Sequence, residues 1–246
     1  MKELWTVLAD RYERVSPLGE GGNGTVFLAK DRNLEIFVAV KAAVKDNPQA
    51  VEALVREREV LKGLCHPGIP RVLDFREGKE HFFLVTEWAK GKNLKEICSK
   101  ECPELGQIWG WILELLKILE YLERQSPPLI HGDLKPEHLI ASAEGRLMLV
   151  DFGSAFWLGQ NPSGHGTEGY AAPELYPEEG QTPGIASDLY SLGASLAKLV
   201  SGRKLPWVWT YIIWKCMRKN PDKRWKNAGF LRHFLIAGKY FHTIKV

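Results

Sequence analysis

The stretch that decides the fold is His131-Gly132-Asp133-Leu134-Lys135-Pro136-Glu137-His138, followed by Asp151-Phe152-Gly153 and Ala172-Pro173-Glu174. Asp133 and Asp151 are carboxylates, which serve as proton acceptors and as ligands for hard cations such as Mg²⁺. Each short motif could arise by chance, but the ordered set in one chain could not plausibly do so. We interpret the rest of the chain outward from these motifs.

Far upstream, Gly19, Gly21, Gly24 and Val26 form a GxGxxGxV array between two predicted strands. Glycine lets the backbone approach phosphate oxygens closely and present its N–H groups. A plain flexible hairpin is one alternative. A dinucleotide-binding turn is another, but that turn should lead directly into a helix. Here residues 26–29 are predicted to form a strand.

The next predicted strand ends in Val38-Ala39-Val40-Lys41, which places a lysine among apolar residues. A surface lysine at a strand end is the alternative interpretation. The following segment predicts a helix with Asn47 as its cap and Pro48 in its first turn, stopped at residues 66–68. This helix offers Glu57 as an acidic partner for Lys41.

The hydrophobic period changes along the chain. Residues 12–87 are mostly strand-like, interrupted by the one helix, whereas the pattern after residues 89–92 is mainly helical, most clearly in IWGWILELLKILEYLERQ and SDLYSLGASLAKLVSG. The sequence predicts an α+β protein with a small β-rich lobe before a larger helical lobe.

Composition excludes several classes of protein. The chain has 246 residues with 33 basic and 30 acidic side chains, a balance that does not favour nucleic acid as a partner. The four cysteines include no CxxC pair, and neither a signal peptide nor a membrane-length apolar stretch is visible. We expect a soluble, cytoplasmic protein that binds no nucleic acid and does not insert into a membrane.

The three motifs resemble the catalytic loop, the metal-binding motif and the end of the activation segment of the eukaryotic-like serine/threonine protein kinase family, in the compact bacterial style. The resemblance runs from about Tyr12 to about Phe234. It implies the two-lobed protein kinase fold as a single domain over residues 1–246. The N-lobe would cover about 1–88 with one lobe-spanning helix, the hinge about 87–93 and the C-lobe about 94–246.

The resemblance also implies an activity, the transfer of the ATP γ-phosphate to a protein hydroxyl, with Mg²⁺ or Mn²⁺ as the metal and an unidentified protein as substrate. Lys41 matches the lysine that contacts the ATP phosphates, and Glu57 its partner, with Glu59 as the second choice. Asp133 matches the carboxylate that accepts the hydroxyl proton, and Asp151 the carboxylate that holds the metal. Lys135 and Thr167 resemble the pair that marks serine/threonine specificity, and we expect Thr167 to contact both Asp133 and Lys135.

Further positions follow from the same resemblance. Thr86 is expected at the gatekeeper position, adenine against the backbone of Glu87 and Ala89, and the ribose near Asn93. Asp188 resembles the buried aspartate that anchors the catalytic loop, and Arg224 the arginine that pairs with Glu174. The full set of expected nucleotide-binding residues is Gly19, Gly21, Gly24, Val26, Ala39, Lys41, Glu57, Thr86, Glu87, Ala89, Asn93 and Ile140.

Three departures from the family pattern stand out. Gly132 replaces a common arginine, so we expect no dependence on phosphorylation of Ser154, Ser163 or Thr167. His138 replaces the asparagine that binds a second metal. As a metal ligand its imidazole would suit Mn²⁺ better than Mg²⁺; alternatively, His138 turns away and hydrogen-bonds the loop, leaving Asp151 as the sole strong protein ligand. Only Arg203 to Thr210 separates the helix of SDLYSLG from YIIWKC, where the family commonly has an extra helix that serves as a substrate-docking platform.

Two other functions stay open. One is a nucleotide-binding pseudokinase that acts as a scaffold, as His138 and the shortened helical lobe suggest. The other is a small-molecule phosphotransferase of the aminoglycoside- or choline-kinase type, against which Thr167, Arg224 and the intact Ala171-Ala172-Pro173-Glu174 segment argue.

Two residue types need an interpretation of their own. The tryptophans are expected to fill the helical lobe, with an exposed docking stripe as the alternative; those concerned are Trp109, Trp111, Trp207, Trp209, Trp214 and Trp225. Cys98 and Cys102 lie four residues apart, a spacing that would put them on one helix face. We interpret them as ordinary side chains because no complete metal-ligand set accompanies them.

Overall fold

The computed structural model describes residues 5, 7–22, 24–162, 166–176 and 180–238. For residue 238 it describes the backbone only. The chain divides into two compact units. Unit 1 comprises residues 1–90 and 150–153, and unit 2 comprises residues 91–149 and 154–246. Among the described residues, no helix is long and apolar enough to cross a membrane.

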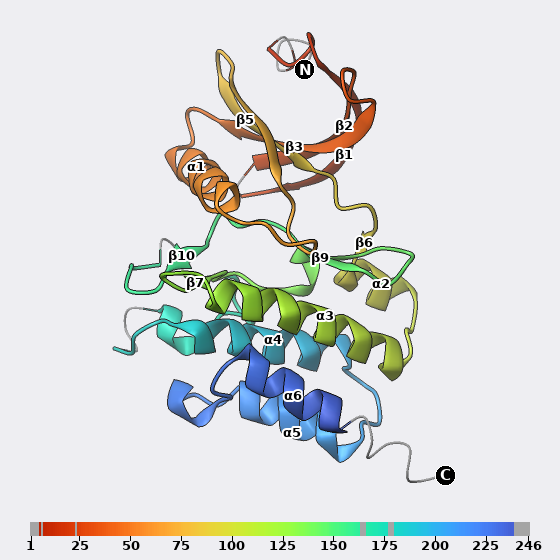
Figure 1. The fold of residues 1–246 in the computed structure, drawn as a ribbon, viewed down its shortest axis with the longest axis vertical. Helices are drawn as coiled ribbons and strands as arrows, with labels where there is room; N and C mark the ends of the chain where they lie inside the picture. The colour runs from red at the N-terminus through yellow and green to blue at the C-terminus, as the bar shows by residue number, and fades with distance from the viewer. Residues whose placement is uncertain (1–4, 6, 23, 163–165, 177–179, 239–246) are drawn as a thin grey trace. The chain divides into compact units, whose positions relative to one another are not determined.

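Unit 1 is a five-stranded antiparallel sheet with one long helix (Figure 1). The strands lie in the order β1-β2-β3-β5-β4. Their bounds are β1 Tyr12–Gly21, β2 Gly24–Asp31, β3 Ile36–Val44, β4 Val72–Glu77 and β5 His81–Glu87, and the helix α1 is Pro48–Lys62. The predicted β-rich first part with one helix is confirmed.

Alternation along β3 sends its side chains into two different cores. Val38, Val40 and Ala42 pack with Trp5 and Leu8, in a cluster that also contains Phe83 and Val85 of β5. Ala43, on the opposite face, packs with Ala50 and Leu54 of α1. Lys41 has the same parity as Ala43, so the strand directs it to the α1 side of the sheet.

Helix α1 begins as its sequence predicts and ends earlier. The side chain of Asn47 accepts a hydrogen bond from the N–H of Ala50, and Pro48 occupies the first turn. The helix ends at Lys62 rather than at residues 66–68. The N–H groups of Gly63 and Leu64 donate three residues back, to the carbonyls of Val60 and Leu61, which tightens and closes the last turn.

Unit 2 is mainly helical (Figure 1), as predicted. Its helices are α2 Leu94–Lys100, α3 Leu105–Glu123, α4 Ile185–Leu199, α5 Trp207–Cys216 and α6 Ala228–Gly238, with short 3₁₀ turns η2 Pro136–His138, η3 Pro173–Leu175 and η5 Pro221–Lys223. Small strands support the loops between them. Three of them, β6 Lys92–Asn93, β8 Leu139–Ala141 and β9 Leu147–Leu149, form one sheet, while β7 Leu129–Ile130 pairs with β10 Phe156–Trp157.

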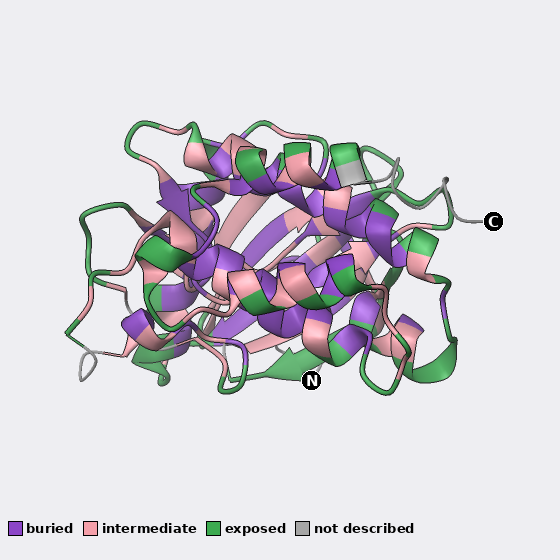
Figure 2. Ribbon diagram, turned by 90° about the horizontal axis from the view of Figure 1, so that it is seen from below, coloured by how far each residue is buried: buried purple, intermediate pink, exposed green. Residues whose placement is uncertain are grey.

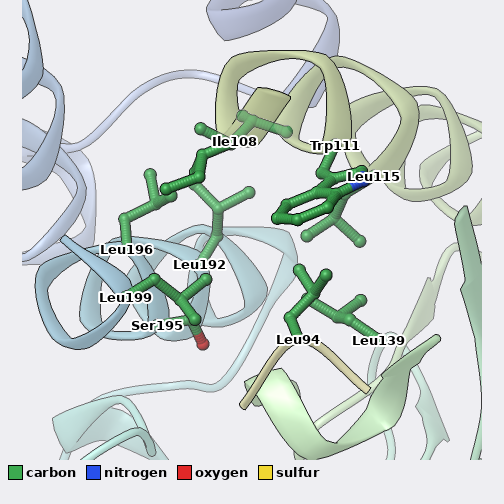
Figure 3. A pocket seen from close by; sticks show the side chains of 10 residues that line it. Leu94, Ile108, Trp111, Leu115, Leu139, Leu192, Ser195, Leu196 and Leu199 are labelled. Atoms are coloured by element: carbon green, nitrogen blue, oxygen red, sulfur yellow. The ribbon is translucent and has the colours of Figure 1, made fainter. Parts of the chain in front are cut away.

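The long helix α3 lies in the core of unit 2. Figure 2 shows buried and exposed residues alternating along the helices, the pattern of amphipathic elements. Figure 3 shows where Leu192 and Leu196 of α4 lie near Ile108 and Leu115 of α3. A pocket of about 20 Å³ remains between these helices, which is room for about one water molecule and too little for a ligand.

Several boundaries in unit 2 differ from those predicted. Helix α5 begins at Trp207, so the connection after α4 is residues 200–206 and the segment up to Thr210 is already helical. Cys98 lies in α2, but that helix ends at Lys100, so Cys102 is beyond it and the two cysteines do not share a helix face. Trp109, Trp111, Trp209 and Trp225 are buried as predicted, whereas Trp207 and Trp214 are exposed.

Candidate active site

In unit 1, a lysine and two carboxylates form a compact charged group. The Nζ of Lys41 lies 2.6 Å from Oε2 of Glu57 and 2.8 Å from Oδ1 of Asp151. Lys41 is 9% exposed and Glu57 5%. Burial alone would lower the pKa of Lys41, but the negative charges of Glu57 and Asp151 outweigh it and raise the pKa above its usual value, so the lysine is a cation.

The structure selects between the two glutamates considered as the partner of Lys41. Glu57 is buried on the face of α1 that meets the sheet, while Glu59 pairs with Arg58 and Lys62 on the surface. Residues three or four apart share a helix face, whereas residues two apart point in different directions. The choice of Glu57 agrees with this geometry.

The segment Val150–Gly153 belongs to unit 1 because α1 and β3 bind it directly. The backbone N–H of Phe152 donates to Oε1 of Glu57 at 3.3 Å, and the guanidinium of Arg56 donates to the carbonyl of Gly153 at 3.0 Å. Asp151 has φ of +64°, an uncommon conformation for a residue with a side chain. Strain of this kind persists where surrounding contacts fix it, and it is common at functional sites.

The glycine array forms the hairpin between β1 and β2, where Gly21 faces Gly24. Gly24 has φ of +117°, and a Cβ there would lie 2.2 Å from the carbonyl oxygen of Ala42. Among the described residues, no heavy atom beyond the chain neighbours lies within 4 Å of a Cβ built at Gly19 or Gly21. The chain continues into strand β2 rather than a helix, which excludes the dinucleotide-binding turn. Asn23 lies outside the described residues.

Sheet register brings other expected nucleotide-binding residues next to Lys41. Val26 of β2 pairs with Lys41, and Thr86 of β5 pairs with Ala39 of β3. Glu87 follows Thr86 and forms a 2.7 Å ion pair with Arg71, while Ala89 lies just past the end of β5. These positions remain predictions for nucleotide contact.

In unit 2, Asp133, Lys135 and Thr167 form a closed triangle of hydrogen bonds. The hydroxyl of Thr167 donates to Oδ1 of Asp133 at 2.7 Å. The Nζ of Lys135 donates to Oδ2 of Asp133 at 3.0 Å and to the Thr167 hydroxyl at 2.6 Å. The expected contacts of Thr167 are confirmed, although 34 residues separate it from Asp133 along the chain.

His138 is buried and bound to the catalytic loop. Its Nδ1 lies 2.8 Å from the carbonyl oxygen of Asp133, which can only accept, so Nδ1 carries the proton. Asn93 caps α2 by accepting from the N–H of Glu96 at 2.8 Å, and it pairs across β6 and β8 with Ile140. The side-chain oxygen of Asn93 therefore has a structural bond besides its expected place near the ribose.

Two buried acids support the catalytic loop and the segment that contains Thr167. Asp188 of α4 accepts from the N–H groups of His131 at 2.8 Å and Gly132 at 3.0 Å. Burial raises the pKa of Asp188, while the electrostatic interaction with His131 and these two bonds act to lower it.

Glu174 receives two bonds from Arg224, at 2.5 and 2.7 Å, with both side chains fully buried. The hydroxyl of Ser187 adds a third, at 2.8 Å. The expected roles of Asp188 and of the Glu174–Arg224 pair are confirmed as contacts.

The backbone conformation at position 132 and the atoms around it favour glycine there. Gly132 has φ of +76°, and a Cβ there would lie 2.8 Å from the carbonyl oxygen of Ser154 and 3.2 Å from the ring of Phe156. In this arrangement no arginine fits at position 132. The space that a longer side chain would need is filled by the residues that follow Gly153.

Two contributors were not predicted. Arg56 precedes Glu57 and was indistinguishable from an ordinary surface arginine of a helix, because its partner is a backbone carbonyl 97 residues away. Ser187 stands three residues after Gly184, at a position where a side chain caps a helix, and its hydroxyl accepts from the Gly184 N–H. The capping position of Ser187 could have been predicted from the sequence, but its hydrogen bond to Glu174 could not.

The residues fit a metal that is bound mainly through nucleotide phosphates. No group of three or more His, Cys, Asp or Glu side chains capable of holding an ion occurs in the described part of the chain. Mg²⁺ in phosphotransferases is commonly held by one or two carboxylates plus phosphate oxygens and water. Asp151, bound to Lys41 and fixed in an uncommon conformation, would provide such a carboxylate if a metal is bound.

Comparison with known proteins gives matches over most of the chain. Residues 12–224 match the family model described as protein kinase domain. Serine/threonine-protein kinase PknG of Mycolicibacterium smegmatis is 33% identical over 200 residues, covering 78% of this chain and 25% of that protein. Serine/threonine-protein kinase B of Synechocystis is 29% identical over 262 residues, covering 97% of this chain and 43% of that protein.

A third relative, the probable serine/threonine-protein kinase CPE1738 of Clostridium perfringens, is 31% identical and covers 80% of this chain and 29% of that protein. The chain thus spans less than half the length of these relatives. The family match, together with the Lys41–Glu57–Asp151 group and the Asp133–Lys135–Thr167 triangle, shows that the chain belongs to the protein kinase family.

Proposed function

We propose that the chain transfers the γ-phosphoryl group of ATP to a serine or threonine hydroxyl of a protein, using Mg²⁺. The observation that carries the proposal is the Asp133–Lys135–Thr167 triangle, because it positions a carboxylate, a cation and a hydroxyl within 3.0 Å of one another. A scaffold that only binds nucleotide has no need of such an arrangement.

Each side chain has a defined part in the reaction. Lys41, held as a cation by Glu57, binds phosphate oxygens, and Asp151 is the carboxylate that would hold Mg²⁺. The ion neutralises charge on the phosphates when it is bound. Asp133 orients the acceptor hydroxyl and takes its proton as the hydroxyl oxygen bonds to the γ-phosphorus, while the bond from that phosphorus to ADP breaks. Lys135 stabilises the charge that develops on the transferred group.

The direct test is incubation with ATP labelled at the γ-phosphate and Mg²⁺, with generic protein substrates in one arm and aminoglycosides and choline in another. We expect label on protein serine or threonine only. Label on a small molecule would favour the small-molecule phosphotransferase, and no label anywhere would contradict both enzyme functions.

A separate measurement tests nucleotide binding. Millimolar Mg²⁺-ATP should raise the melting temperature of the wild type by mass action, and Lys41→Ala should weaken or abolish that increase. Lys79→Ala, at an exposed position between β4 and β5, is the matched control and should keep it. A wild type that melts at the same temperature with and without ATP contradicts nucleotide binding altogether.

The pseudokinase is the second candidate because of His138, whose Nδ1–H is already donated to the carbonyl of Asp133. If that residue disables the site, ATP will stabilise the protein while no phosphate is transferred. The label and melting experiments together therefore distinguish the two functions.

A further inference from the structure

The helix α5 carries an exposed aromatic face that the proposed activity does not use. Trp207, Tyr211 and Trp214 follow one another at the spacing of one helix face. Their ring centroids lie 6.4 Å and 6.0 Å apart in succession. Trp207 is 68% exposed and Trp214 56%. We call these three residues the α5 stripe.

The stripe continues onto α6. The ring of Tyr211 lies 5.8 Å from that of Phe234, and Phe230 stands one turn before Phe234 on α6. Phe230 is 61% exposed, and it and the two tryptophans are the most exposed large hydrophobic residues in the described chain. Three such side chains on neighbouring helices form a surface that a partner would cover.

This surface lies in a strongly basic part of a nearly neutral chain. Residues 203–237 contain nine basic side chains and one acidic one, Asp222. Arg224 and Arg232 are neutralised by Glu174 and Glu120. Six further basic residues of the segment are Arg203, Lys204, Lys215, Arg218, Lys223 and Lys226.

Two of these cations lie directly against aromatic rings. The guanidinium of Arg218 is 4.7 Å from the ring centroid of Trp214, and the Nζ of Lys215 is 4.2 Å from that of Trp225. Arg218 and Trp214 thus place a cation beside an exposed ring of the stripe, whereas the ring under Lys215, that of Trp225, is buried.

We propose that the α5 stripe and the basic residues around it bind the surface of a membrane that contains anionic phospholipids. Tryptophan and tyrosine prefer the boundary between headgroups and acyl chains, and lysine and arginine extend to anionic headgroups from the same depth. Helix α5 has 10 residues, which is too short to cross a bilayer, so it would lie along the surface.

A pocket of about 350 Å³ lies between α3 and α5 and is lined by Leu105, Gly106, Trp109, Gly110, Leu113, Pro206 and Trp209. Trp209 is buried and stands two residues after Trp207, so this pocket is on a different face of α5 from the stripe and takes no part in the proposal. The exposed rings of Trp207, Trp214 and Phe230 favour a membrane over a soluble polyanion, because a helix that lies in the membrane interface buries such rings among the lipid chains.

The experiment is sedimentation of the chain with vesicles of phosphatidylcholine alone and of phosphatidylcholine with 30% phosphatidylserine. We expect binding to the anionic vesicles only, and its loss in 0.5 M NaCl. Trp207→Ala/Trp214→Ala and Lys223→Glu/Lys226→Glu should each weaken binding by at least about tenfold, since they remove apolar contact and charge respectively. All four positions are exposed, so the melting temperature should stay near that of the wild type.

The matched controls are in unit 1: Phe37→Ala, which removes another exposed ring, and Lys79→Glu/Lys90→Glu, which reverses two exposed charges. Both should bind vesicles like the wild type. The proposal is overturned if the wild type sediments with neither kind of vesicle, or if the control and stripe variants bind equally. It is also overturned if a single-stranded oligonucleotide binds while anionic vesicles do not, which would assign the surface to nucleic acid.

Discussion

The two charged groups of this protein are built on opposite plans. In unit 1, the residues expected to bind the nucleotide also hold one another in place: Lys41 forms ion pairs with both Glu57 and Asp151. In unit 2, Asp133 has separate supports: Asp188 holds the backbone of the loop, and the Glu174–Arg224 pair holds the segment after Thr167. A change in unit 1 should therefore affect binding and local structure together, whereas changes in unit 2 should separate them.

The largest expected effect is on the buried support of unit 2. Arg224→Ala leaves Glu174 as a buried charge without its bidentate partner, which should lower the free energy of unfolding by about 3–5 kcal/mol. Urea unfolding measures this, with Lys226→Ala as the exposed control. Arg224→Met/Glu174→Leu should recover part of the loss because no charge is then left buried. A loss below about 1 kcal/mol for Arg224→Ala would show that the pair is not a principal support.

A change at Asp133, the carboxylate proposed to take the proton, should lower turnover. Asp133→Asn should lower turnover by roughly 10²-fold or more, the scale of a positioned acid–base group, while ATP still raises the melting temperature. Lys41→Ala, in unit 1, should lose turnover and the ATP-dependent stabilisation together. If Asp133→Asn also abolishes nucleotide binding, the separation of roles in unit 2 is wrong.

A smaller effect concerns the pH dependence of stability in unit 2. Glu123, at the end of α3, accepts from the N–H of Ala228 at the start of α6 at 2.8 Å. Burial raises the pKa of Glu123 to about 7, although the bond from Ala228 opposes the shift. Between the ordinary value of 4.5 and about 7, the folded chain holds a proton that the unfolded chain has lost.

The contribution of Glu123 to the free energy of unfolding should therefore fall as the pH rises through that interval. Glu123→Gln keeps an acceptor for the Ala228 N–H and removes the titration, so it should flatten the profile of melting temperature against pH. Glu114→Gln, on the same helix, is the control. Identical profiles for Glu123→Gln and the wild type would contradict the assignment.

The histidine of the catalytic loop should have an effect near 1 kcal/mol. His138→Ala removes the bond to the Asp133 carbonyl and should lower the free energy of unfolding by about 1 kcal/mol, whereas His138→Asn can donate to the same carbonyl and should lose less. Turnover in Mg²⁺ and Mn²⁺ tests the proposed part in metal choice: His138→Asn should gain activity with Mg²⁺ and lose a preference for Mn²⁺. Equal rates in both metals for both proteins would leave His138 with its loop bond alone.

The last prediction is that removal of phosphate from the activation segment has no effect on turnover. Ser154 and Phe156 occupy the space that a side chain at position 132 would need. Unit 2 therefore has no arginine at that position that could bind a phosphate on the activation segment. Phosphatase treatment should leave turnover unchanged, and so should Ser154→Ala; Ser163 lies outside the described residues. Thr167→Ala should lose activity for a different reason, the loss of its bonds to Asp133 and Lys135. A wild type that needs a phosphate on Ser154 or Ser163 would contradict this view.

The sequence by itself determined the parts that depend on local pattern or on an ordered motif. Alternating residues predicted the strands of unit 1, Asn47 and Pro48 predicted the start of α1, and the motif order indicated Lys41, Glu57, Asp133, Asp151 and Thr167. These signals are readable because strand period, helix caps and charged residues are properties of short segments.

The tertiary structure alone decided the rest. It showed that residues 150–153 belong with unit 1, that Arg56 holds the Gly153 carbonyl, that Gly132 has no room for a side chain, and that Trp207 and Trp214 are exposed while Trp209 is buried. Backbone carbonyls carry no sequence signal, and an aromatic residue in a helix looks the same whether or not a neighbouring helix covers it. Such outcomes depend on partners tens of residues away, which only the folded chain brings into contact.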